Sequence, residues 1–116
     1  MTNNDKELLM KDLCSRLPYG VKISVNDKIE SLQGINVLDN IVEYGSFLSC
    51  DIEEVKPYLL PLSSMTGEQK SSHNFLKNSA YANPISLIKF YHKNHFDYNR
   101  LIEKGLAIDA TGLNIY

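Results

Sequence analysis

The spacing of apolar residues changes at Pro18, and this change limits the folds open to the chain more than any other feature of the sequence. Upstream of it, apolar side chains recur every three or four residues, as on one face of a helix: Leu9, Met10, Leu13, Cys14 and Leu17. Downstream of it they alternate with polar side chains, as in a strand with one buried face: Val21, Ile23 and Val25. The pattern therefore predicts a helix followed directly by a sheet.

The N-terminal helix is predicted over residues 5–16. Asn4 and Glu7 have the spacing of a capping box at its start. Pro18 ends it, because proline disfavours helical geometry in the residue before it. Cys14 falls on the apolar face, so we expect an inert buried thiol there. Cys50 is far from it in the sequence, and both thiols are expected to be reduced.

Short extended segments follow one another through the first half of the chain. They are predicted over 21–25, 28–32 and 41–48, with a bulge or break at Gly34 and further apolar residues in 35–38. Turn residues separate these segments, which favours an antiparallel meander.

The second half is predicted to be mainly helical. Asp51 and Glu54 mark a short helical turn over 52–55. Pro57 and Pro61 exclude a regular helix or a central strand from residues 56–62. Capping signals then predict helices over 67–78, 84–94 and 97–104, followed by an edge strand within 106–110.

Together these elements predict a single α+β domain over residues 1–116. A small antiparallel sheet, a meander of three to five strands, is expected to pack against the N-terminal helix and the C-terminal helices. Six apolar side chains are expected in the core, because each lies on the apolar side of its element: Leu13, Val21, Ile23, Val42, Ile88 and Leu101.

The composition argues against several classes of function. A formal net charge of -2 gives no overall field that would attract nucleic acid or an anionic membrane. The N-terminus is not basic and the longest apolar runs are two or three residues, so we expect a cytoplasmic protein without export or a membrane span. Phosphate-loop, nucleophile-elbow and CxxC signatures are absent from the sequence, which favours a non-catalytic protein without a cofactor.

A small enzyme or metal site around His92, His95 and Asp97 is the weakest alternative. The two histidines lie three residues apart on one predicted helix, a spacing that suits zinc, and Asp97 follows closely. A second pair of ligands is missing from the sequence pattern, so we expect no bound metal. Instead, His95 is expected to pack beneath Phe96 and hydrogen-bond a backbone group, with His92 exposed.

An apolar segment around two prolines is the candidate interaction surface. Large apolar side chains anchor many protein interfaces, and prolines lower the entropy lost when a loop is ordered. The segment comprises Pro57, Tyr58, Leu59, Leu60, Pro61, Leu62 and Met65. It predicts a protein partner or a homodimer. The alternative is that the segment closes the core between the sheet and the helices.

Charge is divided unevenly along the chain. Residues 1–69 carry six basic and eleven acidic side chains, whereas residues 70–104 carry six basic and two acidic ones. The candidate basic face consists of Lys70, Lys77, Lys89, Lys93, Arg100 and Lys104. Aromatic residues are interleaved with these cations, so the alternative function is a nucleic-acid-associated factor that uses this helical segment. Solvated helix faces, however, carry lysines just as regularly.

Three stretches share a resemblance with known sequences. They are LCSRLPYGVK (residues 13–22), DIEEVKPYLLPLSSMT (51–66) and HFDYNRLIEKGLAI (95–108). In combination they resemble a family of short uncharacterised proteins encoded by gut Bacteroidetes and their phages and prophages. The resemblance covers most of the chain apart from residues 67–83. It implies a bacterial or phage setting and no particular activity, and we therefore expect a small accessory protein that acts through protein contact.

Overall fold

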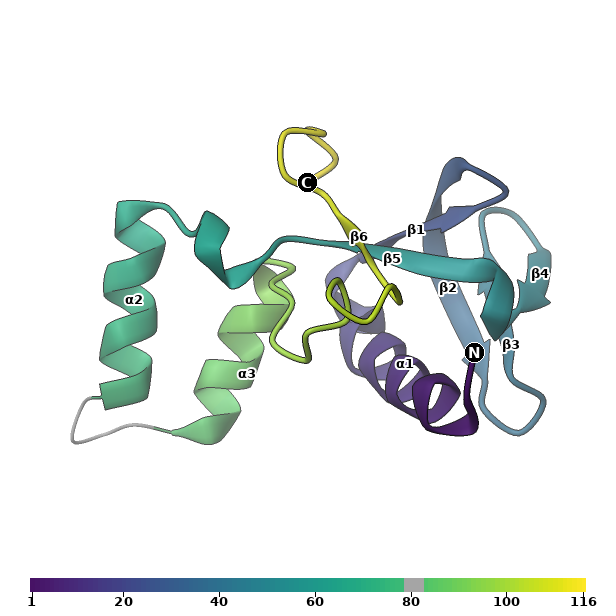
Figure 1. Cartoon of the computed structure of the whole chain (residues 1–116), viewed down its shortest axis with the longest axis horizontal. Helices are drawn as coiled ribbons and strands as arrows, with labels where there is room; N and C mark the ends of the chain where they lie inside the picture. The colour runs from purple at the N-terminus through teal and green to yellow at the C-terminus, as the bar shows by residue number, and fades with distance from the viewer. Residues whose placement is uncertain (79–82) are drawn as a thin grey trace.

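The computed structural model describes residues 1–78 and 83–116 and shows an α+β protein (Figure 1). Its α-helices are α1 (Asn3–Arg16), α2 (Gly67–Asn78) and α3 (Pro84–Lys93). Short 3-10 turns are η1 (Leu17–Tyr19), η2 (Ile52–Glu54) and η3 (Leu62–Ser64). The strands are β1 (Lys22–Val25), β2 (Lys28–Asn36), β3 (Ile41–Tyr44), β4 (Leu48–Asp51), β5 (Val55–Leu59) and β6 (Ile108–Asp109).

The described strands form one sheet in the order β4-β3-β2-β1-β5-β6. Neighbouring strands from β4 to β5 are antiparallel, and β2 shows a register shift at Leu32/Gly34, where a bulge was predicted. β6 pairs with β5 in parallel. The α+β class is therefore confirmed, whereas the sheet has six strands and is mixed, not the predicted antiparallel sheet of three to five strands.

The core lies between α1 and the sheet. Leu9 and Leu13 of α1 are fully buried with Ile23 of β1 and Val42 of β3. Five of the six predicted core residues are buried: Leu13, Val21, Ile23, Val42 and Leu101. The prediction is wrong for Ile88, which is 40% exposed. It precedes the buried His92 by one helical turn, and His92 is the one residue of α3 that is buried.

The first helix begins earlier than predicted. Thr2 accepts a hydrogen bond from the Asp5 amide, and the Asp5 carboxylate accepts one from the Thr2 amide, so the capping box is formed by this pair and not by Asn4 and Glu7. Cys14 is exposed, which corrects the expectation of a buried thiol. Its neighbour Leu13 occupies the core side of the helix instead.

The predicted extended segment 41–48 is a hairpin. Residues 45–47 form a turn between β3 and β4, in which Gly45 and Phe47 have positive φ angles of 56° and 65°. Recognising Gly45 and Ser46 as turn residues would have divided the segment correctly.

Pro57 lies inside a central strand, contrary to the expectation that its segment is irregular. In the register, Ile23 of β1 is opposite Pro57 of β5. Beyond this pair, the Tyr116 hydroxyl bridges the two strands. The Lys22 amide of β1 donates to Tyr116 Oη at 2.9 Å, and that hydroxyl donates to the Tyr58 carbonyl of β5 at 2.6 Å. Residues that face each other alternate along an antiparallel ladder, so the Pro57 nitrogen points away from β1. β6 pairs only with Tyr58 and Leu59, and the missing donor of Pro57 interrupts neither pairing.

Helices α2 and α3 pack against each other and extend away from the sheet (Figure 1). The helix predicted over 97–104 is absent, and that segment forms turns instead. Arg100 has a left-handed φ of 58°, which interrupts a helix, and the Asp97 carboxylate accepts hydrogen bonds from the Leu101 and Ile102 amides.

Candidate protein interface

Most of the predicted interaction segment lies in the core. Pro57, Tyr58, Leu59 and Met65 are buried, and only Leu62 among the large apolar side chains of the segment is substantially exposed, at 38%. Leu60 is partly buried and pairs with Phe96 through a backbone bridge, and Pro61 is also partly buried. Pairing of β5 on both edges explains this burial. In the isolated chain this segment therefore closes the core and does not present a continuous exposed surface.

The histidines and Asp97 do not form a common site. His92 is buried, and its Nε2 lies 2.7 Å from the Tyr98 hydroxyl. His95 stacks on the Tyr116 ring at a centroid distance of 3.6 Å, and its Nδ1 has no hydrogen-bond partner among the described residues. Both outcomes differ from the expected exposed His92 and backbone-bonded His95. Within the described part of the chain, His, Cys, Asp and Glu side chains do not form any group of three that could hold a metal ion.

Burial shifts the pKa values of His92, His95 and the two cysteines. Burial lowers the pKa of His92, and burial together with the nearby Arg16 cation lowers the pKa of His95 to about 4. Both imidazoles are therefore neutral at pH 7. Partial desolvation raises the pKa of the Cys14 and Cys50 thiols, which disfavours the thiolate form.

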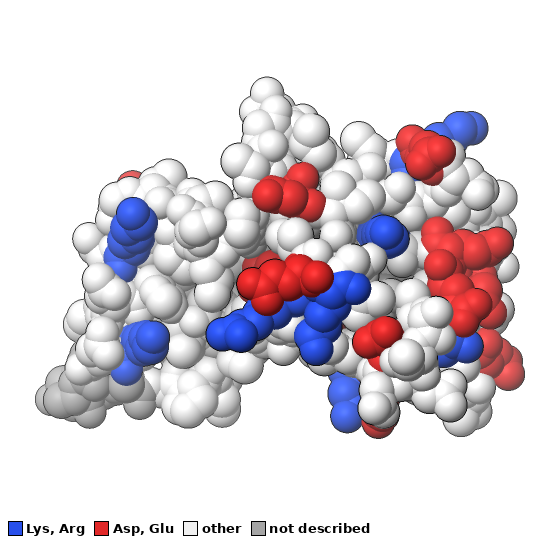
Figure 2. Space-filling model, viewed as in Figure 1, with Lys and Arg blue, Asp and Glu red and all other residues white. Residues whose placement is uncertain are grey.

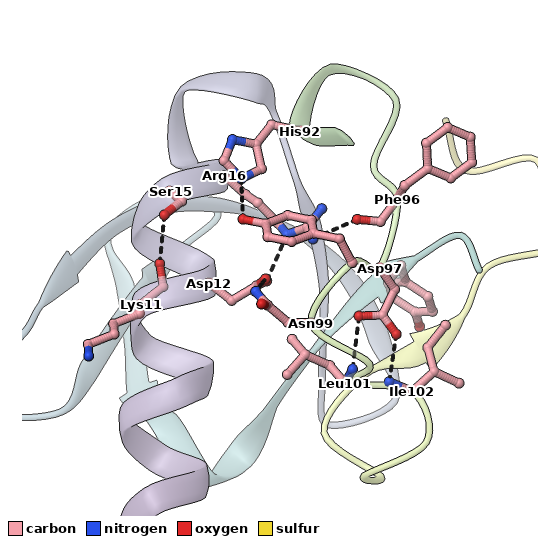
Figure 3. Close-up of polar contacts among 12 residues, drawn as sticks. Lys11, Asp12, Ser15, Arg16, His92, Phe96, Asp97, Asn99, Leu101 and Ile102 are labelled. Carbon is pink, nitrogen blue, oxygen red and sulfur yellow. Dashed lines mark hydrogen bonds and ion pairs between the residues drawn. The ribbon is translucent and has the colours of Figure 1, made fainter. Parts of the chain in front are cut away.

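A buried polar cluster that sequence reasoning missed joins α1 to the segment after α3 (Figure 3). Asp12 and Arg16 form an ion pair with a distance of 2.7 Å between Oδ2 and Nε, and both side chains are almost fully buried. Arg16 Nη2 donates to the Phe96 carbonyl at 2.7 Å, and Asn99 donates to Asp12. The guanidinium lies over the Tyr98 ring. The four-residue spacing of Asp12 and Arg16 on one helix is the sequence pattern that indicates such an ion pair. These contacts fix α1 to the segment after α3, while Arg16 Nη1 is buried without a hydrogen-bond partner among the described residues.

The α2–α3 hairpin carries apolar side chains on its outside. α2 contains no buried residue, and Phe75 is 65% exposed. Phe75 lines a shallow groove between the helices together with Ser71, Ser72, Leu76 and Phe90. Ile85 on α3 is 66% exposed. A hydrogen bond of 2.8 Å between His73 Nε2 and the Tyr91 hydroxyl fixes the two helices to each other. The hairpin is thus a defined structure whose apolar groove faces solvent.

The six residues of the candidate basic face are all exposed, but they do not form one continuous face. Lys70 and Lys77, seven residues apart, share one side of α2, and Lys89 and Lys93, four apart, share one side of α3. Phe75 is five residues after Lys70 and two residues before Lys77. Neither spacing matches a helical repeat, so Phe75 lies on a different side of α2 from the two lysines. Figure 2 shows the basic side chains over α2 separated from those near the centre, which lie beside acidic side chains.

A second exposed apolar feature lies at the turn between β3 and β4. The Phe47 side chain is fully exposed, and Leu48 is 51% exposed. A groove beside them is lined by Glu43 and Gln33 as well as the turn residues. Acidic side chains gather over this end of the molecule (Figure 2). The expectation of one extended segment over residues 41–48 gives no sign that Phe47 lies in an exposed turn.

Comparison of the chain with protein-family models, with curated proteins and with solved structures finds no match. In the part of the chain that the structure describes, none of the helices has the length and apolar character required to cross a membrane.

Proposed function

We propose that the protein is a small non-catalytic accessory protein that binds another protein chain through its α2–α3 hairpin. The observation that carries this proposal is the solvent-facing groove at Phe75. A helix pair that places its apolar side chains outside, while the core is completed by other elements, has the anatomy of a contact surface. The resemblance to phage and prophage proteins adds a bacterial or phage setting to this proposal.

The charge of the hairpin defines the partner's chemistry. Residues 67–94 carry four lysines and a single acidic residue, Glu68. An apolar surface with acidic residues around it would complement this hairpin, because aromatic anchors supply affinity and peripheral charges steer association.

Nucleic acid is the alternative ligand, and the exposure of all six basic residues is the observation in its favour. Binding to single-stranded nucleic acid requires cations along a groove with aromatic rings between them. Here Phe75 and the pair Lys70 and Lys77 lie on different sides of α2, so stacking and phosphate contacts would not coincide. We therefore favour a protein partner.

The test is affinity capture from cells that express the tagged protein, with and without nuclease treatment, using three variants side by side. The wild type and Ile29→Ser are expected to retain the same nuclease-resistant protein, and Phe75→Ser is expected to lose it. Ile29 is the matched control because it is a large apolar residue with a similar exposure of 55% on β2. Loss of all captured material on nuclease treatment would instead support the nucleic-acid alternative, and equal capture by Phe75→Ser would contradict the hairpin assignment.

A further inference from the structure

The exposed turn between β3 and β4 and the groove of the α2–α3 hairpin have complementary chemistry. We propose that this protein assembles with itself head to tail, with the β3–β4 tip of one copy, residues 45–48, docked into the Phe75 groove of the next copy. This inference rests on the proposed function of the hairpin as a binding surface. It adds the identity of one partner, a second copy of the chain.

Phe47 is the first observation. Its side chain has a relative exposure of 107%, and its backbone has a φ of 65°, in the left-handed region that favours glycine or asparagine. A phenylalanine at this position raises the free energy of the folded chain for two reasons. Its backbone conformation is strained, and its large apolar ring is left in water. The fold gains no packing from the ring. Docking into a second molecule would give the side chain a contact that compensates for its cost.

The groove of the hairpin supplies the complementary surface. Phe75, Leu76 and Phe90 form its apolar wall, and Ser71 and Ser72 complete the lining. Aromatic rings prefer to pack against other rings at an angle or with an offset, which two phenylalanines in the groove permit for an incoming Phe47.

Charge favours the pairing of unlike ends over the pairing of like ends. Residues 27–54, which contain the tip, carry seven acidic side chains and one basic side chain, a formal charge of -6. Residues 67–94 carry a formal charge of +3. Lys93 lines a second pocket that shares Ser72 and Phe90 with the groove, so a cation lies beside the docking position, with Glu68 in that same pocket. A symmetric contact between two hairpins would oppose like charges, whereas tip to groove opposes unlike charges.

The geometry makes the contact intermolecular. The tip and the hairpin lie at opposite ends of the molecule, whose longest dimension is 43 Å (Figure 1). Each copy therefore offers one tip and one groove to two different neighbours. Such a contact is heterologous and adds further copies unless a ring closes. A hairpin tip in a shallow groove is a small contact, so the association is expected to be weak and to depend on protein concentration.

The test uses two variants that remove opposite halves of the contact, studied by sedimentation velocity over a range of concentrations. The wild type is expected to show a mass that increases with concentration and decreases at high salt. Phe47→Ser and Phe75→Ser are each expected to stay monomeric. Their equimolar mixture is expected to form a dimer, because Phe47→Ser retains a groove and Phe75→Ser retains a tip. A dimer formed only on mixing is the specific signature of a tip-to-groove contact.

The control is Leu38→Ser, which alters an apolar residue with 94% exposure at the turn between β2 and β3 and should associate like the wild type. Circular dichroism melts of all variants check that each is folded. A mixture that stays monomeric while the wild type associates would refute the tip-to-groove contact, and a wild type that is monomeric throughout would refute self-assembly. In either case, loss of a different captured protein by Phe75→Ser would show that the hairpin still binds a partner.

Discussion

The α1–sheet body and the α2–α3 hairpin differ in where they place their apolar side chains. In the body, α1 and the strands enclose a core in which Leu9, Leu13 and Ile23 are fully buried. In the hairpin, α2 buries no residue and Phe75 faces solvent. Local stability follows the amount of buried apolar contact, so the body is expected to determine the stability of the protein. The hairpin can then change at its surface without loss of the fold, as a binding element requires.

The largest expected effect comes from breaking the buried Asp12–Arg16 ion pair of α1, whose arginine also bonds the segment after α3. Arg16→Met removes the partner of Asp12 and the donor to the Phe96 carbonyl. An unpaired buried charge is strongly unfavourable, and we expect the free energy of unfolding to decrease by about 3 to 5 kcal/mol. Urea denaturation followed by circular dichroism measures this loss.

The double variant Asp12→Leu/Arg16→Met is the matched control. With both charges removed, no unpaired charge is left in the core, and apolar replacements of similar volume are often neutral there. The double variant should therefore recover most of the lost stability. A double variant as unstable as Arg16→Met would mean that the hydrogen bonds to Phe96 and Asn99, and not the ion pair, stabilise this contact.

The sequence predicted the body better than its connections. Apolar periodicity identified α1 and β1, because each has one face in the core and the opposite face more exposed to water. It could not show that Pro57 is compatible with a central strand, because this depends on which side of β5 the proline nitrogen faces and on how short β6 is. Propensity rules describe a residue alone, whereas this outcome depends on the register of two neighbouring strands.

The candidate interface was harder to predict. The apolar side chains at 57–65 predicted an interaction surface, yet most of them complete the core. The exposed groove is formed instead by Phe75 and Phe90, from two helices whose positions along the chain were predicted correctly. A periodic pattern indicates which side of a helix is apolar but not whether another element covers it. Ile88 shows the same limit, since it has the spacing of a core residue and is 40% exposed.

A second prediction concerns pH and the stacked contact between His95 and Tyr116. Because the pKa of His95 is lowered to about 4 in the folded protein, the unfolded chain binds the proton more readily between pH 6.5 and pH 4. The free energy of unfolding should therefore decrease as the pH falls through this range and stay level above it. We expect a loss of about 1 to 2 kcal/mol, less than the full shift would give because the ring is only partly buried.

His95→Asn provides the comparison for this titration. Asparagine tolerates the left-handed backbone of residue 95, whose φ is 60°, and it does not titrate. Denaturation at pH 7 and pH 4.5 should show a smaller difference for this variant than for the wild type. An unchanged difference would assign the pH dependence to other groups, with His92 the first to test because burial lowers its pKa as well.

A third prediction separates stability from association at the tip. Phe47→Gly relieves the left-handed strain at residue 47 and removes an exposed ring, so the free energy of unfolding should increase by about 1 kcal/mol. The same variant should not self-associate. Thermal melts and sedimentation measure the two properties on one sample. A destabilised Phe47→Gly would mean that the ring supports its own hairpin.

The smallest expected effect on stability belongs to the hairpin. Phe75 is 65% exposed and α2 buries none of its residues, so Phe75→Ser should change the free energy of unfolding by less than about 0.5 kcal/mol. Leu13→Ala, in the body, should cost about 2 to 4 kcal/mol by the same urea titration, because it leaves a cavity in a fully buried position. The comparison between the two regions fails if the variants lose similar amounts of stability. In that case the groove would be part of the cooperative core, and loss of binding by Phe75→Ser would report unfolding and not the removal of a contact.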